Sequence, residues 1–340
     1  MLRDGLILLL GLFLLLRIPS VNFSEEVESS INIKISIVEQ FRSRLIDHAK
    51  QLLPEYQAGL LLGMILGVKE EIPWKFNQIL KKTGVVHVVV VSGQNLTLLA
   101  GFILGFSKFF GRKKTIIASL CLVSSYLFLT GFQIPVIRAS IMFFLSSLAK
   151  LYGRQGDSIR ILLITVLLML IFQPLWITSI SFQLSVLATV GVVILAPELI
   201  KRATFIPEIL RQDILVTISA QLLTAPIIAY YFNQFSTAGL FVNLLVLWTV
   251  PFIMISGAFV LLLSLISLPI AKIFIIIPEI FLNYFIGVVE IFNKPFASSY
   301  INEFSIIQLI GVYVVISSCF ILLLKNRKEP HPEGKSDPEF

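Results

Sequence analysis

Residues 87–102 read HVVVVSGQNLTLLAGF, so a run of valines meets a short group of small and amide side chains inside an apolar segment. Polar groups inside lipid cost free energy unless they face protein, water or substrate. Gly93 after Ser92 weakens a helix. The amides of Gln94 and Asn95 can bond to backbone groups that a break releases. The pattern fits a discontinuous helix that lines a cavity, and equally a continuous helix whose polar side chains bond to neighbouring helices.

The composition of the whole chain fits a membrane environment. Of its 340 residues, 56% are hydrophobic and 14% are charged, and the mean hydropathy is +0.91, whereas a soluble domain carries about 25% charged residues. We therefore predict an all-α polytopic membrane protein. The formal net charge of +7 says little about a substrate, because the excess in such a protein lies mainly in short loops.

Apolar runs predict about ten transmembrane helices, some of them broken or re-entrant. The expected spans are 4–19, 84–106, 115–133, 135–150, 159–174, 182–197, 213–232, 238–267, 270–291 and 304–324. Every second loop is basic, beginning with Lys108 to Lys114, whereas the loops near 130–135, 173–181 and 233–238 carry no charge. The positive-inside rule then predicts a multi-pass protein of the cell (inner) membrane with both termini in the cytoplasm.

The expected spans divide the chain into four parts. These are an N-terminal membrane anchor (1–20), a short extracytoplasmic or interfacial region (21–83), a polytopic domain (84–324) and a cytoplasmic polar tail (325–340). The first part also fits a signal peptide, because Arg3 precedes its apolar run, but no small-residue cleavage pattern follows. We favour a retained anchor.

The region 21–83 is expected to contain two short helical elements. Residues Lys34 to Leu53 have apolar side chains three, four and seven positions apart, which predicts an amphipathic helix that ends before Pro54. Such a helix lies either on the membrane surface or on the bundle. Leu60 to Gly67 is apolar but too short to span, so we expect a re-entrant or buried segment there.

Arg138, in FQIPVIRASIMFF (132–144), stands inside an expected span. A guanidinium at a helix centre costs about 3 kcal/mol on insertion scales. The expected spans from 84 to 197 contain no Asp or Glu that could neutralise it. Near the outer interface Arg138 would snorkel to water. Facing the bundle interior, it would supply a fork of donors suited to phosphate or carboxylate.

Two further polar clusters lie in later spans, in SISFQLS (179–185) and TISAQLLTAP (217–226). Polar residues of the second recur at four and three positions, so they share one face of a helix. Such a stripe either packs against a neighbouring helix or lines a path, and amides just downstream favour lining. The candidate lining residues of these regions are Ser181, Gln183, Thr217, Gln221, Thr224 and Asn243.

Sequence motifs for catalysis and metal binding are absent. There is no Walker lysine loop and no HExxH or HxxxH pair, and the three histidines are scattered, so we predict no catalytic residue, metal site or cofactor. The expected spans also lack the paired carboxylates of a proton-driven pump. Cys121 and Cys319 lie in apolar runs without a CxxC motif, and we expect them to be buried, inert thiols.

The polar clusters, taken in order, resemble the membrane domain of the ComEC-type competence proteins. The matching stretches are TGVVHVVVVSGQNLTLLAG (83–101), PVIRASIMFFLSSLAKLYGR (135–154), QPLWITSISFQLSVLATVGVVILAP (173–197) and ISAQLLTAPIIAYYFNQFSTAGLFVNLL (218–245). The resemblance implies that 84–324 is a channel domain passing single-stranded DNA into the cytoplasm during natural transformation. It also implies partners besides the DNA strand and the lipid bilayer: a DNA receptor and a separate nuclease outside, and a helicase or strand-binding protein inside.

The chain departs from the family pattern in two respects. Family members usually read SGLH where this chain has Ser92 to Asn95, so an amide replaces the imidazole. Full-length members also carry an OB-like domain and a nuclease-like domain, whereas the outer segment here is 21–83 and no histidine-rich motif follows the last span. Any nuclease is therefore expected to be another protein, or to be absent.

Two other functions remain open. One is a secondary transporter of a small anionic solute, with a midplane site at the break near Gly93 and at Gln221. The other is a structural platform that organises other membrane proteins.

Overall fold

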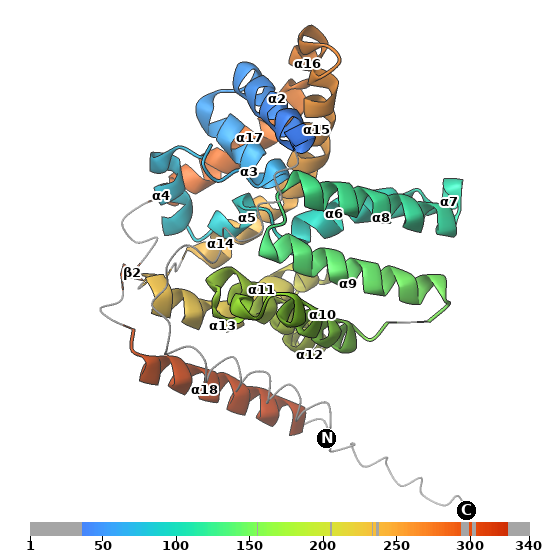
Figure 1. Cartoon of the computed structure of the whole chain (residues 1–340). Helices are drawn as coiled ribbons and strands as arrows, with labels where there is room; N and C mark the ends of the chain where they lie inside the picture. The colour runs from blue at the N-terminus through green and yellow to red at the C-terminus, as the bar shows by residue number, and fades with distance from the viewer. Residues whose placement is uncertain are drawn as a thin grey trace, which may run out of the picture.

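The computed structural model describes residues 36–154, 156–204, 206–232, 234–235, 238–293, 299–300 and 304–325. The α-helices (Figure 1) are α2 (Ser36–Leu52), α3 (Glu55–Leu66), α4 (Trp74–Lys82), α5 (Val86–Val89), α6 (Gly93–Gly105), α7 (Ser107–Phe110), α8 (Arg112–Leu129), α9 (Ile134–Leu151), α10 (Ser158–Phe172), α11 (Ile180–Val190), α12 (Ala196–Arg202), α13 (Glu208–Phe232), α14 (Gly239–Val246), α15 (Val250–Ser264), α16 (Leu268–Phe274), α17 (Ile276–Ile291) and α18 (Ile306–Lys325). Short 3₁₀ turns, η3 (Pro174–Thr178) and η5 (Leu247–Thr249), and a π-helical turn, η4 (Gly191–Leu195), link some of them. Strand β1 (Gln234–Phe235) pairs antiparallel with β2 (Ser299–Tyr300).

Several described helices are suited to cross a membrane. Those long and apolar enough are Ile134–Leu151, Ile180–Arg202, Arg211–Phe232 and Phe241–Ser264, and the pair α16 and α17, bent by 53°, makes a fifth if it counts as one span. Ser158–Phe172 and Ile306–Leu322 are apolar but shorter. The predicted class, an α-helical membrane protein, agrees with these helices.

The described residues do not confirm the predicted number of about ten spans. The first expected span, 4–19, lies outside the described residues, as does the tail beyond 325. The span expected at 84–106 is divided between α5 and α6. The helix expected at 115–133 is α8, which begins earlier, at Arg112, and therefore includes three cations that the sequence analysis assigned to the preceding loop. A break in the helix or charged residues within it therefore exclude from the candidate spans some segments that counting apolar residues alone would include.

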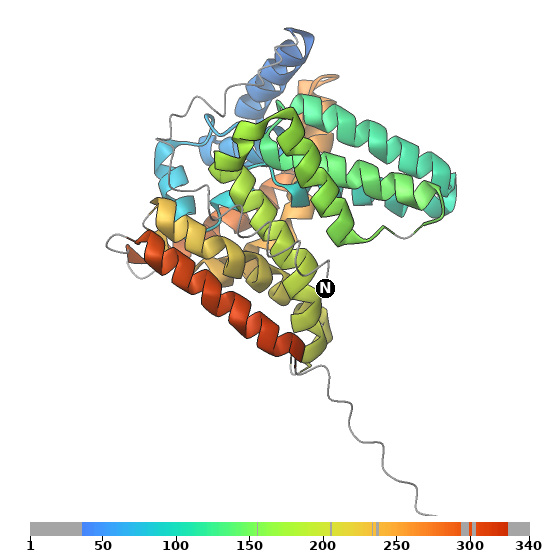
Figure 2. The ribbon, with the colours of Figure 1, turned by 60° about the horizontal axis from the view of Figure 1, so that its bottom comes forward.

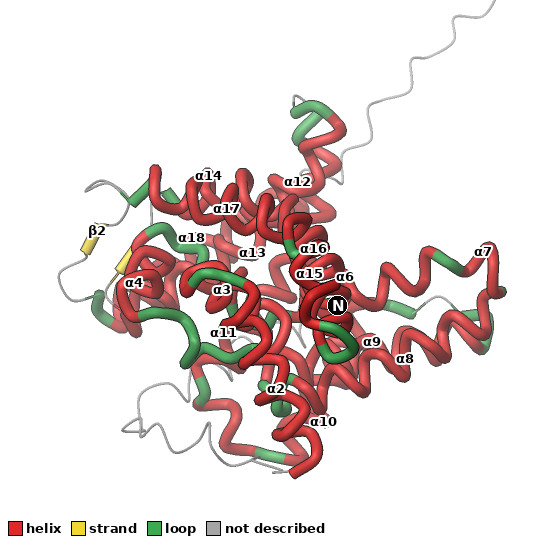
Figure 3. The backbone as a smooth tube through the Cα atoms, turned by 90° about the horizontal axis from the view of Figure 1, so that it is seen from above, coloured by secondary structure: helices red, strands yellow, loops and turns green. Residues whose placement is uncertain are grey.

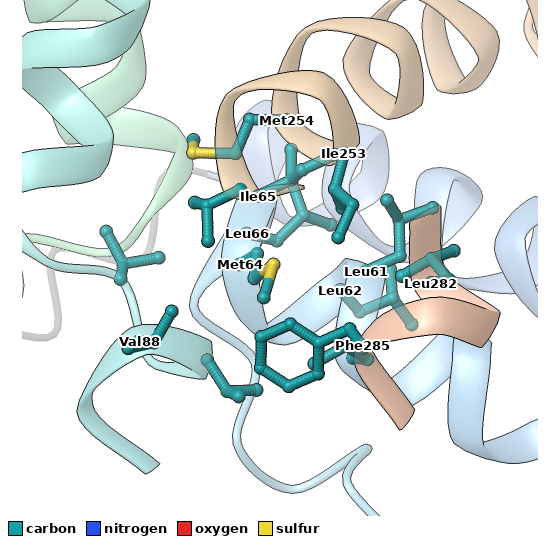
Figure 4. Packing of buried hydrophobic residues seen from close by; sticks show 14 of the residues in the cluster. Leu61, Leu62, Met64, Ile65, Leu66, Val88, Ile253, Met254, Leu282 and Phe285 are labelled. Atoms are coloured by element: carbon teal, nitrogen blue, oxygen red, sulfur yellow. The ribbon is translucent and has the colours of Figure 1, made fainter. Parts of the chain in front are cut away.

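The larger hydrophobic cluster is built around α3. Residues Ala58 to Leu66 of this helix are all buried, and α15 and α17 pack against it. Figure 4 shows Leu61 and Met64 of α3 facing Phe285 of α17 within this cluster. The segment predicted to be re-entrant or buried is thus a buried helix. It ends at Gly67, whose φ of 69° is strained for other residues.

The predicted amphipathic helix forms as α2 and packs on the bundle. Leu45 and Ala49 are buried, and the helix contacts α3 and α15. His48 Nδ1 lies 3.0 Å from Ser264 Oγ on α15, and Lys50 pairs with Glu71 at 2.6 Å. Protein therefore covers the apolar face of the second half of α2, whereas Phe41 in the first half is exposed.

A second, smaller cluster joins α9, α10, η3 and α11. It consists of Ile134, Leu162, Val166, Met169, Trp176, Phe182 and Val186. Helix α9 borders both clusters, because Val136 and Ala139 belong to the larger one and Ile134 to the smaller. We call the boundary between the two clusters along α9 the seam.

The remaining helices extend outward from these clusters. Seen from above, α6 and α8 form a hairpin that projects from the bundle with α7 at its tip (Figure 3). Helix α18 runs along α13 (Figure 2), and the Tyr313 hydroxyl donates to the Leu223 carbonyl at 2.7 Å.

Candidate functional site

Of the two interpretations left open for residues 87–102, the structure has the helix break. Helix α5 ends at Val89, Ser92 is extended (φ −119°, ψ 165°), and α6 begins at Gly93. The Ser92 hydroxyl accepts a hydrogen bond from the Asn95 amide at 3.4 Å, as expected of an N-cap serine. The chain therefore presents a helix N-terminus at the half-buried Gly93.

Asn95 links this break to the end of α3. Its side chain is 1% exposed, and Nδ2 donates to the Met64 carbonyl at 3.3 Å. The Tyr126 hydroxyl donates to the same carbonyl at 3.3 Å, and Gln133 Nε2 donates to the Gly67 carbonyl at 2.8 Å. Because the last carbonyls of a helix lack partners within it, these side chains satisfy the buried end of α3. Asn95 thus has a structural role.

Arg138 lies at the seam, in the second turn of α9, and is 8% exposed. Its Nε donates to Ser185 Oγ on α11 at 2.7 Å, and its Nη1 to Met142 Sδ at 3.3 Å. In the described part of the chain, no Asp or Glu forms an ion pair with Arg138 and no acceptor bonds to its Nη2. The guanidinium is therefore a buried cation without a described counter-ion.

Gly93 makes room for this guanidinium. A Cβ atom at Gly93 would lie 2.8 Å from Arg138 Nη2 and 3.2 Å from the Ala139 methyl group. Any larger residue would push the end of the arginine away from the start of α6. The structure thus brings Gly93, Arg138 and Ser185 together from three helices.

The stretch of sequence that contains Gly93 and Arg138 carries only positive charge. No Asp or Glu occurs between Glu71 and Asp157, whereas this stretch contains ten Lys and Arg residues. The N-terminus of α6 adds the partial positive charge of a helix end beside the guanidinium. We call Gly93, Arg138 and Ser185 the Arg138 cluster.

The other predicted site residues lie in separate environments. Gln94 is exposed, whereas Gln183 is 3% exposed and its Nε2 donates to the Ile177 carbonyl at 3.0 Å. The Thr217 and Thr224 hydroxyls donate to carbonyls of their own helix at 2.8 and 3.0 Å. These residues have no hydrogen bond to the Arg138 cluster among the described residues.

Three more candidates differ in burial. Ser181 and Gln221 are half-buried. Asn243 on α14 is fully buried, and neither its amide nitrogen nor its amide oxygen has a hydrogen-bond partner in the described structure. A buried amide without partners is costly, and Asn243 is the described residue at which both side-chain atoms lack one, whereas Ser140 and Ser179 each have one such oxygen.

Sequence reasoning did not select Ser185 as a site residue, although it lies four positions after Ser181 in the same cluster. The helical period places the two on one face, but the residue that meets Arg138 depends on how α11 packs on α9. The expectation of buried cysteines is wrong, because Cys121 and Cys319 are exposed. In a membrane protein an apolar surface faces lipid, so an apolar run does not imply burial.

Comparison with known proteins supports the family resemblance. A family model described as "Competence protein" matches residues 64–326. ComE operon protein 3 of Bacillus subtilis (strain 168) is 28% identical over 253 residues, which cover 72% of this chain and 32% of that protein. Uncharacterized protein YcaI of Escherichia coli (strain K12) is 26% identical over 207 residues, 57% of this chain and 28% of that protein.

A third relative, an uncharacterized protein of Aquifex aeolicus (strain VF5), is 29% identical over 210 residues, which cover 61% of this chain and 47% of that protein. The chain thus matches less than half of the length of each of these relatives. No solved structure gives a significant match. Because the family model covers most of the chain and includes all three residues of the Arg138 cluster, the chain belongs to the competence protein family.

Proposed function

We propose that this chain forms a path in the cell membrane through which a single strand of DNA passes into the cytoplasm during natural transformation. Membership of the competence protein family supports this proposal. The observation that carries it is the buried Arg138 guanidinium, which has no described carboxylate partner. A buried arginine with only a structural role is normally paired with a carboxylate.

The physical requirements of strand passage fit the Arg138 cluster. A polyanion that crosses a membrane needs donors for its phosphates and surfaces that accept any base. Binding must also be weak enough for release. One guanidinium beside a hydroxyl and a helix N-terminus offers attraction at one point, whereas a row of cations would hold the strand.

In this proposal the lining residues centre on Gly93 and Arg138, with Ser185 added to the set predicted from sequence. Ser92 caps the helix at this point, Asn95 bonds to the carbonyl of Met64, and Gln183 bonds to the carbonyl of Ile177. The remaining proposed lining residues are Gln94, Ser181, Thr217, Gln221, Thr224 and Asn243. The protein has both termini in the cytoplasm and catalyses no reaction itself. A DNA receptor and a nuclease act outside, and a helicase or strand-binding protein acts inside.

The test is uptake of labelled DNA by cells in which the gene is deleted and then restored. Arg138→Gln removes the charge, and we expect uptake to fall by about tenfold or more, because a hydrogen bond to a charged group contributes about 1.5–3 kcal/mol. Arg154→Gln, at an exposed arginine that follows the same helix, is the matched control and should leave uptake near the wild-type level. Immunoblots of the membrane fraction establish that both variants insert.

Two outcomes would contradict the proposal. Normal uptake in the Arg138→Gln strain would remove Arg138 from the path, and undiminished uptake after deletion would remove the whole chain from DNA transport. The helix break beside a cation also fits a carrier of a small anionic solute. Salt distinguishes the two, since strand binding weakens steeply with salt as phosphate contacts release counterions, whereas binding of one small anion has a shallow dependence.

A further inference from the structure

We infer that the Arg138 guanidinium and the first turn of α6 form a binding site for one phosphodiester anion, with Arg138 Nη2 and the Gly93 and Gln94 amides as its donors. The inference deepens the proposed function, on which it rests for its physiological ligand. The site itself is argued from three features of the molecule: donors without acceptors, positive charge without a counter-ion, and a positioned guanidinium.

The donors converge from two elements. Neither the Gly93 nor the Gln94 amide has an acceptor among the described residues, because the chain before Gly93 is extended and provides no preceding turn. Arg138 Nη2 also has no acceptor there, and it lies beside Gly93. A helix N-terminus with free amides favours anions, and the guanidinium is a second, independent donor directed at it.

The electrostatics favour a negative charge at the start of α6. A helix N-terminus repels a cation, yet the fold buries Arg138 against one. The described residues supply no carboxylate to offset this, and the chain from 72 to 156 contains none. An anion bound between them would be attracted both by the Arg138 guanidinium and by the N-terminus of α6.

The residues around the site favour an anion with one negative charge over an anion with two. Nε and Nη1 of Arg138 are already bonded to Ser185 and Met142, and the Ala139 methyl group lies on the same side as Gly93. A phosphodiester carries a single charge shared by two oxygens, which suits one free guanidinium nitrogen and two amides. Ser185 acts as a positioning residue, because its oxygen fixes Nε and thereby aims Nη2.

The test uses the full-length protein in lipid nanodiscs and dimethyl phosphate, the simplest phosphodiester anion. We expect the ³¹P NMR signal of dimethyl phosphate to broaden in the presence of protein, and the signal of neutral trimethyl phosphate to stay sharp. Equal broadening of both signals would overturn the inference, because binding would then be independent of charge.

Variants locate the site. Arg138→Gln should weaken dimethyl phosphate binding by about tenfold or more, since it removes a charge-assisted hydrogen bond. Gly93→Ala should also weaken it severalfold, because the added methyl group displaces the flexible end of Arg138 without a clash against backbone. Gly101→Ala, on the same helix with nothing within 4 Å of its added methyl group, is the matched control. Full binding by Arg138→Gln, or equal losses in both glycine variants, would overturn the inference.

Competition identifies the source of the phosphodiester. Displacement of dimethyl phosphate by a short oligothymidylate assigns the site to a DNA strand. Displacement only by phosphatidylglycerol, added to the nanodisc lipids, assigns it to a lipid headgroup; both results retain the phosphodiester site. Failure of the site and failure of the proposed function are separable: DNA uptake that depends on Arg138 without dimethyl phosphate binding overturns this inference alone, whereas binding without a defect in uptake overturns the proposed function.

Discussion

At Arg138, the absence of a neighbouring side chain matters as much as the charge itself. The guanidinium reaches the start of α6 only because Gly93 has no Cβ, and it keeps its direction because Ser185 accepts from Nε at 2.7 Å. Changing any of the three residues therefore alters the position of one cation. Asn243 is a second residue at which the interior holds an unsatisfied polar group.

The variant Asn243→Leu tests whether the buried amide of Asn243 contributes to stability or to transport. Because an unsatisfied buried amide costs about 1–3 kcal/mol, we expect the leucine variant to unfold at a higher temperature in detergent and, since its amide is lost, to take up less DNA. Asn283→Leu, at an exposed amide on α17 that bonds to Gln57, is the control and should not raise the unfolding temperature. A stabilised Asn243 variant with full uptake would exclude Asn243 from the path.

At the scale of elements, the contact between η4 and α13 fixes the position of α11. The span from Ile180 to Arg202 contains a π-helical turn at η4, and such turns shift the face that a helix presents. A Cβ atom at Gly191 in this turn would overlap the Ser219 carbonyl of α13. This close approach sets how α11 lies, and Ser185 is on α11.

Gly191→Ala should therefore destabilise the protein. The added methyl group meets a backbone carbonyl that cannot rotate away, so the two helices must separate, at a cost of about 1–3 kcal/mol. Thermal unfolding in detergent measures this as a lower midpoint. Gly287→Ala on α17, with nothing within 4 Å of its methyl group, should leave the midpoint unchanged or raise it, because alanine favours helices more than glycine does. Equal midpoints for the two variants would mean that the η4 contact is not tight.

At the scale of the whole molecule, basic loops gather at one end. The tip of the α6 and α8 hairpin lies beside the end of α9, where Arg112 Nη2 donates to the Lys150 carbonyl at 3.5 Å. Tyr152 follows at this end and is 80% exposed, and Leu175 in the uncharged turn η3 is 58% exposed. In the proposed topology, which follows the positive-inside rule, this basic end lies on the cytoplasmic side.

Single cysteines at these two positions test that orientation. In a background with Cys121→Ser and Cys319→Ser, we expect Leu175→Cys to react with a membrane-impermeant maleimide in intact cells and Tyr152→Cys to react only after permeabilisation. Labelling of Tyr152→Cys in intact cells would reverse the proposed topology. Gel shifts of the labelled protein provide the measurement.

The sequence by itself determined the features that depend on neighbours in the chain. Composition indicated a helical membrane protein, the period of α2 predicted its helix, and Ser92 followed by Gly93 marked the position where a break before α6 was one of two open interpretations. These predictions succeed because capping, helix propensity and amphipathic period act within one or two turns. The number of spans could not be fixed in this way, since the segment expected to span at 84–106 is divided between α5 and α6.

Only the tertiary structure decided which polar groups meet. Arg138 and Ser185 are 47 positions apart in the chain, and Asn95 and the carbonyl of Met64 are 31 apart. The sequence marked both Arg138 and Asn95 as candidates, yet packing gave one a place beside a helix N-terminus and the other a structural hydrogen bond to a helix end. The physical reason is that a polar side chain in a buried helix takes whichever partner the packing of neighbouring helices brings within reach, and that packing depends on contacts far apart in the sequence.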